Sequence, residues 1–195
     1  MPRTCILTVG STRFDPLVAA FLRPTVLSSL ASLGVERVFA QVGNSVVPLG
    51  WTEGRNQREG LAVEVVKFAP DVEREVAGAE LVVSHAGAGS ILSFLRPLPG
   101  SLSSASSSTT TPPPRRRRLI LVPNSTLMDS HQSDLADEMQ KKGWAVVVER
   151  ADDLSEALKK LARDASRPAE VEEPSYPSLD EVKVQRILDE TLGYV

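Results

Sequence analysis

Short apolar stretches alternate along the chain with stretches that carry apolar residues at helical spacing. The apolar stretches, which we predict to be strands, span residues 5–9, 38–42, 61–68, 81–84, 119–122 and 145–148. The predicted helices span residues 15–33, 71–77, 91–95, 130–142 and 153–163. Pro24 is expected to break the first helix, and Asp71 is expected to cap the second. Because the strands are apolar throughout, the pattern predicts an α/β fold with a Rossmann-like, mostly parallel sheet and helices on both faces.

Several segments fall outside this alternation. Residues 50–60 are polar and contain glycine, which predicts a loop. Residues 97–118 hold proline, serine and threonine tracts, and we expect them to form a disordered insertion within a domain spanning residues 1–165. Residues 166–178 are expected to be a linker. Residues 179–195 contain an amphipathic helix that either packs on the domain or docks on a partner, and the sequence leaves both open.

The insertion ends in a run of four arginines, Arg115–Arg118. Such a run is able to contact an anionic lipid or an acidic partner. We favour the simpler interpretation, a solvated group of charges beside a hydrophobic strand.

Composition limits the classes of function. The 195 residues include 22 Lys and Arg against 25 Asp and Glu, a net charge of −3, which lacks the basic excess of a nucleic-acid binder. One cysteine and two histidines are too few for a Cys/His zinc site, so no metal is expected. No apolar run reaches the roughly 20 residues that span a bilayer, and no signal peptide is recognisable. The sequence predicts a protein of the cytosolic side.

Candidate chemistry lies in the turns that follow predicted strands, because ligands bind at the carboxyl ends of parallel strands. Gly10, Ser11 and Thr12 follow the first strand, and His85, Gly87, Ala88, Gly89 and Ser90 follow the fourth. Glycine lets the backbone approach a phosphate, and the N–H groups that open a helix favour an anion. Local sequence alone explains the glycines equally well by close packing, and His85 equally well as a buried histidine. For residues 129–132 it favours a helix N-terminal cap over a ligand site.

Standard nucleotide and hydrolase motifs are missing. The sequence holds no phosphate-binding P-loop motif and no nucleophile elbow. Leu92 stands where a dinucleotide-binding fingerprint would need its third glycine.

Three segments in combination resemble one family. Residues 84–92 (SHAGAGSIL), residues 119–124 (LILVPN) and residues 127–132 (LMDSHQ), with residues 9–12 (VGST) at the start, are similar to the eukaryotic catalytic subunits of UDP-N-acetylglucosamine transferase, of the family 28 type. The resemblance implies the C-terminal, sugar-nucleotide-binding half of a GT-B glycosyltransferase. It also implies a heterodimer with a membrane-anchored, acceptor-binding subunit, peripheral at the cytosolic face of the endoplasmic reticulum.

The resemblance implies a reaction as well. N-acetylglucosamine would pass from UDP to N-acetylglucosaminyl-diphosphodolichol, in a β1,4 linkage with inversion and without a cofactor. The alternative is a UDP-sugar-binding module with another sugar or acceptor, or with lost catalysis.

The resemblance also implies a role for particular residues, some of them in the two turns already described. Amides around residues 10–12 and 87–90 would hold the diphosphate, and Phe68 would meet the uracil through main-chain groups. Asp129, His131 and Gln132 would face the sugar hydroxyls. The general base is expected on the other subunit, and His85 is the candidate on this chain. The sequence departs from the family at Ser93, where relatives tend to carry a carboxylate for the ribose hydroxyls, and in the 97–118 insertion.

Overall fold

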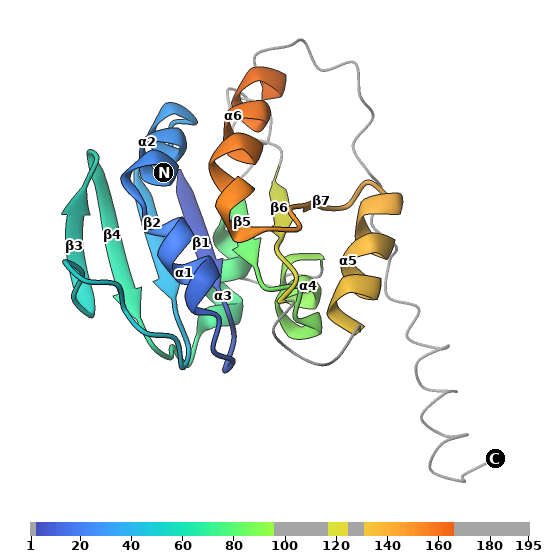
Figure 1. Cartoon of the computed structure of the whole chain (residues 1–195), viewed down its shortest axis with the longest axis horizontal. Coiled ribbons are helices and arrows are strands. Elements are labelled where there is room, and N and C mark those ends of the chain that lie inside the picture. Colours follow the sequence, from blue (N-terminus) through green and yellow to red (C-terminus); the bar gives the residue numbers. More distant parts are fainter. Residues whose placement is uncertain (1–2, 96–116, 125–130, 166–195) are drawn as a thin grey trace, which may run out of the picture.

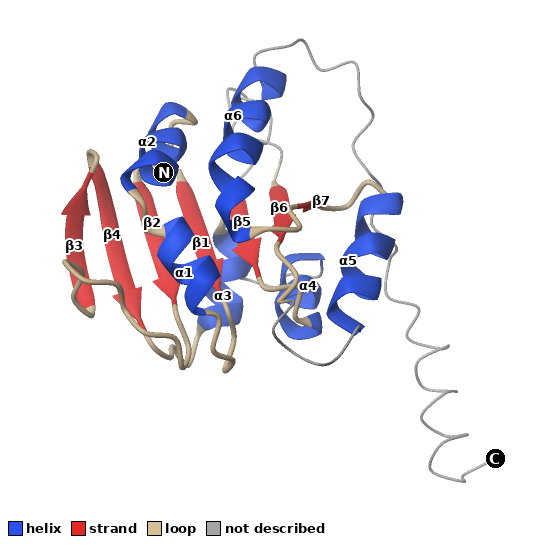
Figure 2. Ribbon diagram, viewed as in Figure 1, coloured by secondary structure: helices blue, strands red, loops and turns tan. Residues whose placement is uncertain are grey.

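The computed structural model describes residues 3–95, 117–124 and 131–165. Its centre is a seven-stranded sheet in the order β3-β4-β2-β1-β5-β6-β7. The strands are β1 (Thr4–Thr8), β2 (Arg37–Gln41), β3 (Gly54–Arg58), β4 (Leu61–Val66), β5 (Leu81–Ser84), β6 (Arg118–Leu121) and β7 (Val146–Val147). All neighbours pair in parallel except β3 and β4. The predicted α/β class and mostly parallel sheet are confirmed (Figure 2).

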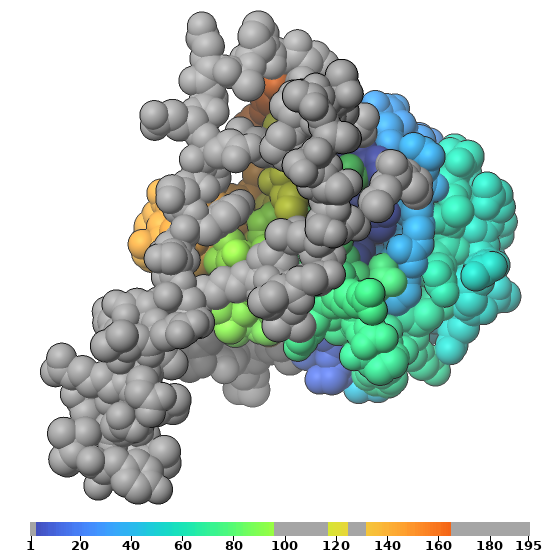
Figure 3. All heavy atoms as spheres, turned by 180° about the vertical axis from the view of Figure 1, so that it is seen from behind, coloured from blue at the N-terminus to red at the C-terminus, as the bar shows by residue number. Residues whose placement is uncertain are grey.

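Helices cover both faces of the sheet. They are α1 (Asp15–Phe21), α2 (Pro24–Ser32), α3 (Val72–Gly78), α4 (Ala88–Leu95), α5 (His131–Lys141) and α6 (Leu154–Ala165), with a 3-10 turn η1 (Ala151–Asp153) before α6. Helices α1, α2 and α6 pack on one face of the sheet (Figure 1). Seen from behind, α3 and α4, in green, lie on the opposite face (Figure 3). No described helix is long and apolar enough to cross a membrane.

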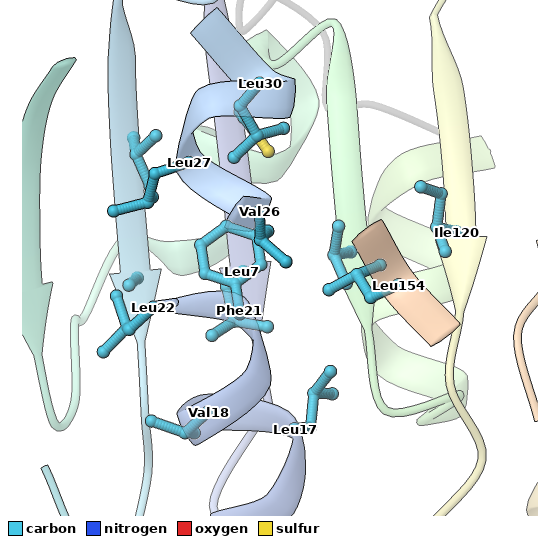
Figure 4. Close-up of a cluster of buried hydrophobic side chains, with 14 of the residues drawn as sticks. Leu7, Leu17, Val18, Phe21, Leu22, Val26, Leu27, Leu30, Ile120 and Leu154 are labelled. Carbon is cyan, nitrogen blue, oxygen red and sulfur yellow. The ribbon is translucent and has the colours of Figure 1, made fainter. Parts of the chain in front are cut away.

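Two hydrophobic clusters hold these layers together. In the first, Leu7 of β1 and Ile120 of β6 lie under Phe21, Leu30 and Leu154 from the three helices of that face (Figure 4). All five side chains are fully buried. Ile6, next to Leu7, points to the other cluster, as the alternation of side chains along a strand requires. Strands β1, β2, β5 and β6 are therefore buried on both sides along most of their length.

Several predicted boundaries shift. Proline does separate the first helix, since α1 ends at Phe21 and α2 begins at Pro24. Asp71 occupies the N-cap position of α3, but its side chain makes no capping hydrogen bond, so that prediction was wrong. Helix α4 begins at Ala88, three residues earlier than predicted.

The predicted loop 50–60 contains an edge strand, which is a correction. Strand β3 pairs antiparallel with β4 through a turn at Glu59 and Gly60, whose φ angles are 51° and 78°. Two consecutive positive φ angles are typical of the tight hairpin turn that matches strand twist. The strand has no apolar side chain, and an edge strand exposed to water needs none.

Two members of the arginine run, Arg117 and Arg118, are also reinterpreted. Residues 96–116 lie outside the described residues, but Arg117 is half-buried and Arg118 begins β6. The Arg117 guanidinium donates to Ala79 O at 3.0 Å, Phe94 O at 3.0 Å and Val76 O at 2.8 Å. It also lies 4.4 Å from the Phe94 ring centroid. Arg117 therefore joins the end of α3 to α4, and is neither a solvated charge nor a lipid contact.

Candidate functional site

The carboxyl edge of β1 and β5 brings two of the predicted turns together. The turn Gly10–Thr12 follows β1, and the segment from His85 to α4 follows β5, which pairs with β1. The backbone N–H of His85 donates to Thr8 O at 3.3 Å, so the two segments leave the sheet side by side. This adjacency is what a parallel sheet predicts for turns that follow neighbouring strands.

The other predicted site residues are more scattered. Phe68 lies beyond the end of β4, two strands from β1, with its side chain 57% exposed. Gln132, in the first turn of α5, accepts a hydrogen bond from the Asn124 backbone at 3.3 Å. Asp129 lies outside the described residues, as does the side chain of His131.

The imidazole of His85 fills the space between the two turns. The residue is 5% exposed, and its Nδ1 lies 3.4 Å from Thr8 O. A Cβ atom at Gly87 would stand 2.4 Å from His85 Nε2, and one at Gly10 would stand 3.1 Å from Cε1. Gly87 is thus required for the close approach of its backbone to the ring. Ala86, between them, has a φ of 63°, a left-handed conformation that costs a non-glycine residue about 1 kcal/mol or more.

Burial lowers the pKa of His85, although the carbonyl of Thr8 partly offsets this effect. The ring is therefore neutral near pH 7. If Nδ1 carries the proton toward Thr8 O, the Nε2 lone pair lies beside Gly87 and is the group that accepts a proton.

Acidification is expected to destabilise the protein through this residue. Because the folded pKa of His85 lies below the ordinary value of about 6.5, the unfolded chain takes up a proton at higher pH than the folded one. The stability contributed by neutral His85 is complete when the pH is above the ordinary pKa of about 6.5, and it is lost as the pH falls through the folded pKa. Urea unfolding of the wild type and of His85→Gln between about pH 7.5 and 5 checks this, since the variant should lose part of the slope. Equal slopes would assign the pH dependence to other groups.

The Gly10–Thr12 turn is held from the side of β2. The side chain of Gln41 donates to Gly10 O at 2.7 Å, and the side chain of Asn44 donates to Ser11 O at 2.8 Å. The backbone N–H of Asn44 donates to Thr12 O at 3.0 Å. Sequence analysis missed both Gln41 and Asn44. The available signal was a polar residue, Gln41, inside an otherwise apolar strand.

Some N–H groups at this edge of the sheet have no hydrogen-bond acceptor in the described part of the chain. Gly10 N donates to Thr8 Oγ1 at 3.2 Å, and Thr12 N donates to Val9 O at 3.2 Å. Within the described residues, Ser11 N has no acceptor. The amides of Ala88, Gly89 and Ser90 form the first turn of α4, where no preceding helical carbonyl is available. The combination is suited to binding an anion.

Ser93 lies one turn further along α4. Its hydroxyl donates to Gly89 O at 2.9 Å, so it is engaged with its own helix. No group of three or more His, Cys, Asp or Glu side chains within the described ranges is placed to hold a metal ion.

Comparison with known proteins gives a consistent result. The glycosyltransferase family 28 C-terminal domain matches residues 4–97. The UDP-N-acetylglucosamine transferase subunit ALG13 of Cryptococcus neoformans is 33% identical over 99% of this chain and 98% of its own length. The human subunit of that name is 32% identical over 70% of this chain and 10% of its own.

Solved structures share the fold. An NMR structure of ALG13 superposes with a TM-score of 0.54 at 21% identity, covering 97% of this chain and 96% of its own. The MurG protein of Acinetobacter baumannii gives a TM-score of 0.52 at 18% identity, covering 86% of this chain and 42% of its own.

Proposed function

Because the chain belongs to the family of UDP-N-acetylglucosamine transferase subunits, we propose that it is the donor-binding, catalytic subunit of a two-subunit glycosyltransferase. It takes N-acetylglucosamine from UDP and, with a membrane-anchored partner, transfers it to N-acetylglucosaminyl-diphosphodolichol. The partner holds the chain at the cytosolic face of the endoplasmic reticulum.

One observation carries this proposal. Two turns with unpaired N–H groups, at Ser11 and in the first turn of α4, flank the same buried neutral histidine. A diphosphate spans two such groups, and oriented N–H donors stabilise the negative charge that develops on it as the sugar leaves. No cofactor takes part in this scheme.

The remaining contacts are those that the resemblance to the family implies. Main-chain groups around Phe68, at the end of β4, meet the uracil. His131 and Gln132, which begin α5, and Asp129, which precedes it in the sequence, meet the sugar hydroxyls.

The chemical step needs a base. The acceptor hydroxyl oxygen bonds to the anomeric carbon from the face opposite UDP, and the bond from that carbon to the phosphate oxygen breaks. UDP leaves with the electron pair, and the configuration inverts. A base on the partner takes the hydroxyl proton. His85 is the second candidate, because its ring is neutral and therefore able to accept a proton.

Transfer of labelled N-acetylglucosamine to a short-chain N-acetylglucosaminyl-diphosphoprenol tests the proposal. The assay uses the chain alone and the chain co-expressed with candidate membrane-anchored subunits. Activity only in a pair supports a split transferase. Competition by UDP-glucose and UDP-galactose tests the sugar. A pair that assembles and binds UDP but transfers no sugar would favour a binding module that has lost catalysis.

Replacing Ser93 with glutamate is expected to strengthen nucleotide binding. The Ser93 hydroxyl is engaged with Gly89 O, whereas a carboxylate accepts two strong hydrogen bonds from neighbouring ribose hydroxyls. We expect UDP to bind roughly three- to tenfold more tightly. Isothermal titration of both proteins with UDP measures this, and titration with UDP lacking both ribose hydroxyls is the control. Equal gains with the two ligands would contradict a ribose contact.

A further inference from the structure

The carboxamide of Gln41 forms hydrogen bonds with three different segments of the chain. Gln41 ends β2 and is 3% exposed. Its Nε2 donates to Gly10 O at 2.7 Å and to Lys67 O at 2.8 Å. Its Oε1 accepts from Thr8 Oγ1 at 2.7 Å. The opposite orientation of the amide would place Oε1 against two carbonyl oxygens, so this network fixes which atom faces which segment.

The bond to Gly10 O orients a whole peptide group. The carbonyl of Gly10 and the N–H of Ser11 belong to one planar trans peptide, in which they point in opposite directions. Drawing the carbonyl inward to Gln41 therefore turns the Ser11 N–H away from β2. The Ser11 N–H is also the N–H group of the turn that has no acceptor in the described part of the chain.

The same side chain also holds the backbone that follows β4, the strand next to β2. Lys67 O accepts both from Gln41 Nε2 and, at 2.9 Å, from the backbone N–H of Gly43. Lys67 immediately precedes Phe68, the residue whose main chain is assigned to the uracil. One buried side chain thus sets the separation between the turn after β1 and the backbone after β4.

We propose that Gln41 is a positioning residue for the donor nucleotide, which it never touches. Gln41 holds the Gly10–Ser11 peptide with its N–H toward the diphosphate and fixes the uracil-facing backbone relative to it. The inference rests on the proposed function, which supplies the ligand. Without the carboxamide, the peptide after glycine is free to turn its carbonyl oxygen toward the phosphates, where it repels them.

UDP titration of the full chain tests this role, by calorimetry and by the amide resonances of Ser11 and of residues 88–90. Gln41→Met keeps the length of the side chain and removes its hydrogen bonds. We expect the Kd for UDP to rise about tenfold or more, which corresponds to the loss of one hydrogen bond to a charged group. We also expect that saturation with UDP no longer shifts the Ser11 amide resonance, while it still shifts those of residues 88–90. A general loss of structure would diminish all of these shifts alike. Gln57→Met, at an exposed position of β3, is the matched control.

The outcomes distinguish the role of Gln41 from the proposed function. A folded Gln41→Met protein that binds UDP within twofold of wild type, with the Ser11 shift intact, overturns the role of Gln41 alone. A wild-type chain that shows no shift with millimolar UDP overturns the proposed function and this role with it. If Gln41→Met does not fold, Gln41→Leu decides, because it removes the same three hydrogen bonds and leaves the bond from Gly10 N to Thr8 Oγ1 in place. In Gln41→Leu, weaker binding with a reduced Ser11 shift supports the role, and unchanged binding overturns it.

Discussion

Alanine at Gly87 is expected to reduce transfer by the assembled enzyme at least about 100-fold, the effect of losing an oriented hydrogen-bond donor at a developing negative charge. The new Cβ would stand 2.4 Å from His85 Nε2 and 2.5 Å from Cε1. The ring is 5% exposed, so any retreat would displace the groups packed around it. The turn before α4 must therefore shift, and its amides move with it. The ratio kcat/KM for UDP-N-acetylglucosamine measures the loss.

Gly78→Ala is the matched control for this variant. Gly78 ends α3, and a Cβ there meets nothing within 4 Å. Full transfer is expected from Gly78→Ala, with circular dichroism and the urea midpoint reported for both variants. Wild-type turnover by folded Gly87→Ala would show that the close approach to His85 serves packing alone.

The second large effect concerns stability. Arg117→Ala is expected to lower the free energy of unfolding by about 3 kcal/mol, which for a chain of this size lowers Tm by roughly 6–12 °C. The substitution leaves three backbone oxygens without the guanidinium that they share and removes its contact with the Phe94 ring. Urea and thermal unfolding measure the change.

Two further variants make the interpretation specific. Arg117→Lys keeps the charge but loses the planar fork, so an intermediate loss is expected. Arg74→Ala, at an exposed position of α3, should change stability by less than about 0.5 kcal/mol. Equal losses for alanine and lysine at position 117 would mean that the geometry of the fork is the whole contribution. No loss for either would contradict the role of Arg117 in joining α3 to α4.

Hydrophobic patterning predicted β1, β2, β5 and β6 because these parallel strands are buried on both faces along most of their length. Strand β3 escaped prediction for the complementary reason. It lies at the edge, its five residues are polar or glycine, and its pairing depends on backbone hydrogen bonds that no side-chain pattern reveals. The break at Pro24 was predictable, since proline removes a helical donor wherever the helix would continue.

The site was predictable to the extent that topology places it. Turns after adjacent parallel strands must meet at one edge, and those at Gly10 and Gly87 do. The contribution of Gln41 was hidden, because a side chain that binds backbone carbonyls of distant segments leaves no periodic signal. Arg117 was hidden by its neighbours, since it belongs to a run of charges in the sequence and to a helix junction in the structure.

The contact between Arg117 and Phe94 has a consequence for how the chain tolerates change in length. Phe94 lies near the end of α4 and Arg117 just before β6, so their hydrogen bond closes the connection between them at its base. Once the ends of a loop are fixed, doubling its length costs only about 0.6 kcal/mol of chain entropy. Helix α4 starts at the edge that carries the nucleotide turns, whereas Phe94 and Arg117 meet beside the end of α3, near the start of β6. Both ends of the connection are thus anchored away from those turns, and a reporter domain inserted between residues 96 and 116 is expected to leave UDP binding unchanged.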